Sequence, residues 1–146
     1  RGTLSPVLES FGWTLDLDAL VRFAHWCPMR DGSFDAQFFL TDLGTGAVDI
    51  AVDATENTRL FWSSAQGALA AADQGDISVI FPTRCNLERL AQFGSYAEAR
   101  HHAETTPIRM ITPWSEERDG EPWLTIPDDL GYPMTSKPMT SVIRGL

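Results

Sequence analysis

Carboxylates in two stretches of the sequence are the side chains best suited to chemistry. Glu56 precedes Trp62 by six positions in the segment VDATENTRLFWSSAQGAL, where an acidic loop leads into a predicted strand. A carboxylate held at the edge of a sheet can serve as a general base or as a ligand for a hard metal ion. Asp53 is close enough in sequence to share such a site. The same pattern also fits a solvated turn with no chemical role.

The second stretch is SFDAQFFLTDL, residues 33–43, in which Asp35 interrupts an apolar run. A short continuous apolar run bounded by polar turns predicts a strand that is buried on both faces. A carboxylate buried in such a strand needs a partner, and Arg22 on the neighbouring predicted strand is the candidate. For Asp35 a structural ion pair is therefore favoured over catalysis.

Other common catalytic and ligand-binding patterns do not occur in the sequence. Cys27 and Cys85 form no zinc-type cluster with histidine. His101 and His102 are consecutive on a predicted helix, so they point in different directions and cannot share one metal site. His25 lies on a predicted strand and fits a hydrogen-bonded core residue. There is no nucleophile elbow, phosphate-binding loop or dinucleotide-binding glycine pattern.

Length and composition indicate one globular domain, residues 1–146. The chain is 43% hydrophobic, and no apolar run approaches the about 20 residues that cross a bilayer. A net charge of −9 without a compensating basic stretch argues against nucleic-acid binding. A divalent cation could still bridge the acidic chain to a phosphorylated small molecule. Two cysteines without a C-x-x-C pair favour free thiols and a cytoplasmic location.

The predicted elements give a mixed α/β pattern of the α+β kind, with strands meeting in hairpins rather than in regular βαβ units. Ser63 or Ser64 and Gly75 bound a short Ala-rich helix, and Ser95 with Glu98 forms a capping box. The first predicted helix has Ser5 as its N-cap, Pro6 at its first position and Gly12 as its stop. The other predicted helices span 63–75, 82–94 and 95–104. The predicted strands span 21–26, 34–40, 47–54, 58–64 and 77–81, and IRMITPW is predicted to form a hairpin with EPWLTIP.

Five segments together resemble the coenzyme A diphosphatase-like branch of the Nudix hydrolases. AHWCP and FDAQFFL are similar to its His-Trp-x-Thr-Pro and Arg-Arg-Phe-Asp-Thr-Arg-Phe-Phe stretches. ENTRLFWSSAQGAL is similar to Glu-x5-Trp-x-x-x-x-Ala-Leu, FPTRCNLERLAQF to Pro-Thr-x-x-x-Leu-x-x-Leu, and DLGYPMT to a closing Gly-Tyr-Pro of bacterial members. In order and spacing the match runs from Phe11 to Thr135, which is most of the chain.

The resemblance implies a Nudix-like mixed sheet flanked by helices and hydrolysis of a pyrophosphate in a nucleoside-diphosphate-linked, coenzyme A-like substrate. In that family Mg²⁺ or Mn²⁺ bridges the diphosphate and activates water. The metal ligands come from a helix with the pattern Gly-x5-Glu-x7-Arg-Glu-x-x-Glu-Glu-x-Gly, which these 146 residues do not contain. The acidic segment SEERDG, residues 115–120, has the wrong spacing and lies in a predicted turn.

The chain therefore resembles the C-terminal portion of such a protein, with an incomplete fold and no metal ligand assigned in it. The metal-binding helix is expected from a missing N-terminal segment or from a complementary chain. Without that element, the strands predicted at 34–40 and 77–81 would leave a large apolar patch in water.

The chain also departs from the family pattern around its first matched strand. Gly32 and Ser33 replace the paired arginines, and Gln37 replaces the arginine two residues after Asp35, so three positive charges are absent. Asp35, Gln37 and Asp53 are the expected substrate-binding residues. Glu56 is the expected catalytic residue, as an auxiliary base or as a carboxylate supporting the metal.

Two hypotheses follow for the function. In the first, the intact protein is a metal-dependent Nudix hydrolase, which the presence of Glu56 favours. In the second, the chain is a non-catalytic Nudix-fold module that binds a nucleotide-like ligand or another protein, which the missing arginines favour.

Overall fold

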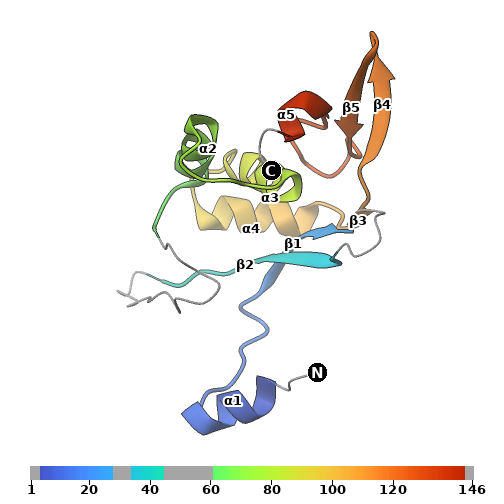
Figure 1. Cartoon of the computed structure of the whole chain (residues 1–146). Helices are drawn as coiled ribbons and strands as arrows, with labels where there is room; N and C mark the ends of the chain where they lie inside the picture. The colour runs from blue at the N-terminus through green and yellow to red at the C-terminus, as the bar shows by residue number, and fades with distance from the viewer. Residues whose placement is uncertain (1–3, 28–33, 45–60, 144–146) are drawn as a thin grey trace.

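The computed structural model describes residues 4–27, 34–44 and 61–143 and shows a mixed α+β fold, which confirms the predicted class (Figure 1). The helices are α1 (Leu4–Phe11), α2 (Ala65–Gln74), α3 (Phe81–Leu90), α4 (Tyr96–Thr105) and α5 (Met139–Ile143). The strands are β1 (Val21–Trp26), β2 (Ala36–Leu40), β3 (Met110–Ile111), β4 (Trp114–Arg118), β5 (Glu121–Thr125) and β6 (Ser136–Pro138).

The first sheet has the strand order β2-β1-β3, with β2 antiparallel and β3 parallel to β1. Its register shifts between Arg22 and Ala24, so Phe23 is an extra, bulged residue of β1. The bulge lets two consecutive residues, Phe23 and Ala24, both reach the core. On either side of it the normal alternation of faces continues.

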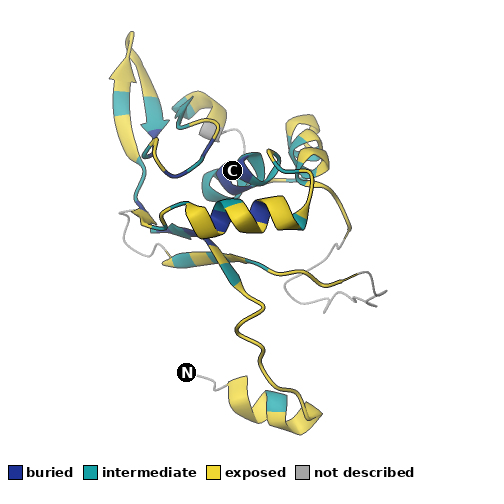
Figure 2. Cartoon of the chain, turned by 180° about the vertical axis from the view of Figure 1, so that it is seen from behind, coloured by how far each residue is buried: buried dark blue, intermediate teal, exposed yellow. Residues whose placement is uncertain are grey.

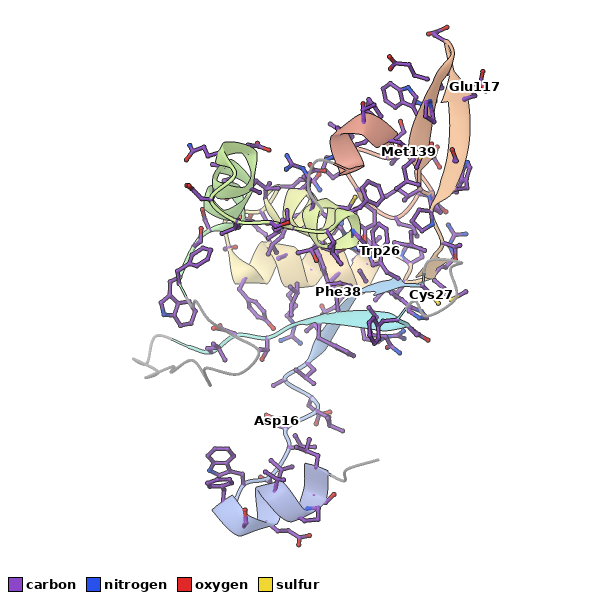
Figure 3. The ribbon with its side chains drawn as sticks, in the orientation of Figure 1. Asp16, Trp26, Cys27, Phe38, Glu117 and Met139 are labelled. Atoms are coloured by element: carbon purple, nitrogen blue, oxygen red, sulfur yellow. The ribbon has the colours of Figure 1, made fainter. Side chains whose placement is uncertain are left out.

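The core lies between this sheet and the helices α3 and α4, which cover one of its faces (Figure 1). Figure 3 shows Trp26 and Phe38 on the side of the sheet that faces these helices. The buried members of the core are Phe23, Ala24, Trp26, Cys85, Ala103, Ile111, Ile126, Leu130 and Tyr132. Burying these side chains is the main favourable contribution to folding.

The strand predicted at 34–40 exists, but the prediction that both of its faces are buried was wrong. Gln37 and Phe39 are exposed, whereas Ala36, Phe38 and Leu40 are partly buried, so the faces of β2 alternate. Within the described residues, β2 is an edge strand of a sheet that the helices cover on one side. The face that carries Phe39 is called the outer face below.

The second sheet is an antiparallel meander, β4-β5-β6, and it corrects the predicted hairpin. EPWLT pairs with WSEER across a turn formed by Asp119 and Gly120, whose φ angles are 52° and 80°. Two central residues with positive φ are typical of a type I′ turn, for which Asp-Gly is a preferred pair. This dipeptide is the signal in the sequence that identifies the hairpin, whereas Met110 and Ile111 pair with β1 instead.

The helix predictions follow the local capping signals. Ser64 accepts a hydrogen bond from the Gly67 amide at the start of α2, and Gly75 ends that helix with a φ of 81°. The Ser95 hydroxyl likewise accepts from the Glu98 amide at the start of α4, as the capping box predicts.

Two of the predicted strands are not found where the structure describes their residues. Residues 77–80 have no regular structure, and Phe81 begins α3, where Pro82 suits the first turn of a helix. Residues 61–64 are not a strand either. The strand predicted at 47–54, and residues 58–60 of the next one, lie outside the described residues.

Helix α1 and the extended segment 12–20 stand apart from the rest of the fold (Figures 1 and 2). No residue of α1 is buried. The helix begins at Leu4, one residue before its predicted cap, and ends as predicted at Gly12, whose φ is 65°. In the part of the chain that the structure describes, no helix is long and apolar enough to cross a membrane.

Gly131 and Gly120 provide a matched test of close packing, because their φ angles are 77° and 80°. A Cβ atom added to Gly131 would lie 2.4 Å from His102 Nε2, whereas one added to Gly120 meets nothing within 4 Å. We expect Gly120→Ala to lower the free energy of unfolding by about 1–2 kcal/mol through backbone strain. Gly131→Ala should lose a further ~1–3 kcal/mol through overpacking. Urea unfolding measures both values, and equal losses would contradict the close approach.

Candidate functional site

Asp35 lies on the outer face of the first sheet, where it pairs with a histidine. Its Oδ1 atom is 2.6 Å from His25 Nε2, and its side chain is 63% exposed, against 19% for His25. The expectation of a buried carboxylate was therefore wrong, because Asp35 precedes β2 at the exposed end of the sheet.

The predicted pairing of Asp35 with Arg22 was also wrong, and the register of the sheet explains why. Gln37 is directly opposite His25, so Asp35, two residues before Gln37, is the diagonal neighbour of His25 on the same face. Arg22 lies opposite Phe39, farther along the strand pair. The structural role expected for Asp35 thus involves a different partner, at the surface.

His25, Asp35 and Gln37 together form the outer-face cluster. Gln37 is exposed and shares this face because it alternates with Asp35 along the chain. The cluster offers a carboxylate, an imidazole and an amide, which can exchange hydrogen bonds with the hydroxyl or amide groups of a polar ligand. The other two predicted site residues, Asp53 and Glu56, lie outside the described residues.

A cavity of about 490 Å³ lies between the end of α2, the start of α3 and strand β6. Two cations and one acid line it: Arg84, Lys137 and Asp73. Arg84 bonds to Asp73 at 2.7 Å and to Glu88 at 3.2 Å, and Lys137 donates to the same oxygen of Glu88. Because both cations are already paired, an anion that entered the cavity would compete with these carboxylates.

The charges around this cavity act on one another. Partial burial by itself lowers the pKa of Arg84, but hydrogen bonds and charge from Asp73 and Glu88 raise it above its usual value. Glu88 Oε1 accepts from both Arg84 and Lys137, whereas its Oε2 atom is buried without a hydrogen-bond partner. Sequence reasoning missed this group: Arg84 and Glu88 have the spacing of a helical pair, but Asp73 on α2 and Lys137 on β6 join them only through the packing of the elements.

A polar cluster in the core connects three distant segments. Trp26 Nε1 lies 3.3 Å from Asn86 Oδ1 and 3.2 Å from the Tyr132 hydroxyl, and it donates toward both oxygens. The Tyr132 hydroxyl donates in turn to Asn86 Oδ1 at 2.9 Å. Burial raises the pKa of Tyr132, so its hydroxyl keeps the proton that this bond requires.

Arg89 extends the cluster with a charge that is 2% exposed. Its Nη1 donates to the Phe23 carbonyl at 2.6 Å and its Nε to His102 Nε2 at 3.2 Å, while its guanidinium carbon lies 4.3 Å from the centre of the Phe23 ring. These partners are neutral, and burial lowers the pKa of Arg89. The cluster is enclosed in the core, so it positions β1, α3 and the segment around Tyr132 rather than contacting a ligand.

The two thiols differ in their surroundings. Cys27 is half-buried and Cys85 is buried, and neither forms a disulfide. Burial raises the pKa of Cys85 to about 12, with a smaller contribution from the charge of Glu88. Cys85 therefore stays protonated at neutral pH and cannot serve as a thiolate nucleophile there.

The described residues do not fit the Mg²⁺ or Mn²⁺ ion that the resemblance implies. In segments 4–27, 34–44 and 61–143, no group of three or more His, Cys, Asp or Glu side chains could hold a metal ion. The carboxylates of the outer-face cluster and the cavity already bind cationic side chains or histidine. We therefore derive no catalytic step through a metal on these residues.

Comparison of the chain with protein-family models, curated proteins and solved structures found no significant match.

Acidification should weaken the fold through His102. Burial and the charge of Arg89 lower the pKa of His102, because the imidazolium form is disfavoured in the native state. As the pH falls below about 6.5, the His102 imidazole therefore becomes protonated in the unfolded chain before it does in the folded chain. The stability that neutral His102 contributes is fully present above this pH and is lost as the pH falls through the lower, folded-state value.

We expect His102→Gln, whose amide oxygen can still accept from Arg89, to lose less stability than the parent between about pH 7 and about pH 5. Urea unfolding at a series of pH values measures this slope. His101→Gln is the comparison: the charge of the exposed His101 makes only a smaller contribution to lowering the pKa of His102, so this variant should change the slope less than His102→Gln does. The interpretation fails if both variants keep the slope of the parent protein.

Proposed function

We propose that this chain is part of a metal-dependent Nudix-type hydrolase that cleaves a nucleoside-diphosphate-linked, coenzyme A-like substrate. In this proposal, the metal-binding helix and its Mg²⁺ or Mn²⁺ come from a polypeptide segment outside these 146 residues. The net charge of −9 favours a small-molecule substrate, held through the cation, over a nucleic acid.

The observation that supports the proposal is the meeting of the resembling segments in one core. Trp26 of AHWCP, Asn86 of FPTRCNLERLAQF and Tyr132 of DLGYPMT bond to one another. Phe38 of FDAQFFL packs against the same core. The convergence places four of the five resembling segments in one folded unit, as the proposal requires.

The outer-face cluster is the proposed substrate-binding part of this chain. His25, Asp35 and Gln37 are polar, at least partly exposed and close together, and they lie on the face of the sheet that α3 and α4 leave open. A segment that covered this face would enclose a ligand between itself and the cluster. Asp53 and Glu56 remain the proposed further binding residue and auxiliary base.

The second candidate function is a Nudix-fold module that binds without turnover. Two observations favour it. Asp35 and Asp73 are held in ion pairs, and Gln37 stands where the family pattern has an arginine. Such a module would bind a nucleotide-like ligand or another protein.

Turnover assays on the intact protein and on this chain separate the two functions. With Mg²⁺ or Mn²⁺ and coenzyme A, ADP-ribose or dinucleotide polyphosphates, we expect hydrolysis by the intact protein that a chelator abolishes. We expect no hydrolysis by the 146 residues alone, because they contain no metal-binding helix pattern. Chelator-sensitive turnover by the chain alone would overturn the second expectation. Binding without turnover by the intact protein would establish the second candidate, and neither binding nor turnover would exclude both.

Two substitutions in the intact protein test the roles of the carboxylates. Glu56→Gln should lower kcat at least ~10-fold, which is within the usual contribution of a positioned acid or base. Asp35→Asn should raise KM with little change in kcat, as expected when a ligand contact is lost. Its effect on stability should stay below ~1 kcal/mol, since the ion pair with His25 is largely exposed. A fully active Glu56→Gln protein would remove Glu56 from the site.

A further inference from the structure

The cavity between α2, α3 and β6 has both apolar and charged residues in its lining. Its charged residues are Arg84, Lys137 and Asp73. Its volume of about 490 Å³ lies within the range of about 300–1,000 Å³ that small-molecule sites occupy. Figure 1 shows α2, α3 and α5 on the side of the molecule away from β2, so the cavity lies apart from the outer-face cluster. Its apolar residues are Ala72, Ile77, Val79, Phe81, Met134 and Pro138.

The apolar part of the lining is partly fixed and partly open to water. Phe81 packs against the core, where its ring meets the Trp26 ring edge to face with the centres 6.0 Å apart. Met134, by contrast, is 49% exposed. A ligand with an apolar body would remove this exposed surface from water, which is favourable.

The two cations of the cavity have donors to spare. Arg84 carries five N–H donors and Lys137 carries three. Arg84 Nη2 donates to Asp73, and Arg84 Nε and Lys137 Nζ donate to Glu88. These ion pairs engage two donors of the arginine and one of the lysine, so both side chains can donate to a further acceptor. The cavity therefore favours a ligand that carries an anionic group.

The two carboxylates differ in how firmly they are held. The Glu88 side chain is 15% exposed, and its Oε1 atom accepts from both cations. Asp73 is 61% exposed and pairs with Arg84 through one oxygen. An exposed ion pair is weak because water competes with it, whereas breaking a mostly buried pair leaves a charge that is poorly solvated. Asp73 is therefore the carboxylate that an entering anion would displace.

The start of α3 adds to the attraction for an anion. Its N-cap residue is Ile80, which makes no side-chain cap, and Phe81 at the first position of the helix lines the cavity. Helices α2 and α4 are capped instead by Ser64 and Ser95. The first amides of a helix lack acceptors within the helix, and the helix dipole is positive there. An anion bound by Arg84, in the first turn of α3, would lie near this positive end.

We propose that the cavity binds a small monocarboxylate with an apolar body. The ligand carboxylate takes the place of Asp73 at Arg84, the charge of Lys137 adds to the attraction, and the apolar body packs beside Phe81. The existing ion pair shows that a carboxylate fits Arg84 at this position. A phosphate monoester is disfavoured, because it would bring additional negative charge toward Glu88. This proposal does not depend on the hydrolase assignment, and its test measures binding rather than turnover.

The test compares 4-methylpentanoate with its uncharged amide, 4-methylpentanamide, by isothermal titration calorimetry on the intact protein. We expect the acid to bind and the amide to bind at least ~10-fold more weakly, because hydrogen bonds between two charged groups are the stronger ones. Isopentyl phosphate, which has a similar apolar body, should bind more weakly than the acid. Changes in the chemical shifts of the backbone amides of α2 and α3 locate the ligand.

Substitutions of the two residues in the exposed ion pair should have opposite effects. Arg84→Gln should weaken binding of the acid at least ~10-fold, because the charged donor is lost. Asp73→Asn should tighten it about 2- to 5-fold, because the competing carboxylate is removed. A purely structural role of the pair would instead weaken binding in both variants. Arg100→Gln and Glu104→Gln are the matched controls, since these residues form a 2.7 Å ion pair on α4 outside the cavity lining.

Several results would overturn the proposal. They are equal affinity for the acid and the amide, tighter binding of isopentyl phosphate, or no gain in affinity from Asp73→Asn. Absence of binding at up to about 10 mM 4-methylpentanoate would do so as well. Ala72→Phe, which adds a ring to the lining, should abolish binding, and unchanged affinity in this variant would place the ligand elsewhere. Thermal melting followed by circular dichroism confirms that each variant keeps the fold.

Discussion

The hydrogen bonds among Trp26, Asn86 and Tyr132 fix the relative positions of three parts of the chain. They join β1, α3 and the segment before β6, so the sheet, the covering helix and the C-terminal region are fixed against one another. Arg89 adds a charge that is bound inside the core by the Phe23 carbonyl and by His102. Buried polar groups are costly unless they are hydrogen-bonded, and the cluster is only partly satisfied, because Asn86 Nδ2 and Arg89 Nη2 are buried without a hydrogen-bond partner.

Helix α3 separates this core cluster from the charged cavity. Asn86 and Arg89 are three residues apart and turn toward the sheet, whereas Arg84 and Glu88 are four residues apart and pair beside the cavity. One helix therefore carries both the buried hydrogen-bond network of the core, which includes the Arg89 charge, and the ion pairs near the surface.

Within the described residues, one face of the first sheet is left open. Helices α3 and α4 cover one face of the first sheet, and the outer face carries His25, Asp35 and Gln37. Helix α1 also stands on the side away from these helices (Figure 1).

Local sequence signals determined most of the elements of this protein, and tertiary pairing decided the candidate site. Ser64, Gly75 and the Ser95–Glu98 pair bound helices α2 and α4 as predicted, because capping depends on neighbouring residues alone. The apolar character of Ile77–Phe81 did not distinguish a strand from a loop leading into a helix, since periodicity is ambiguous over such short runs. Asp35 pairs with His25 because of the register between β1 and β2 and the bulge at Phe23. The spacing of these residues along the chain encodes neither the register nor the bulge.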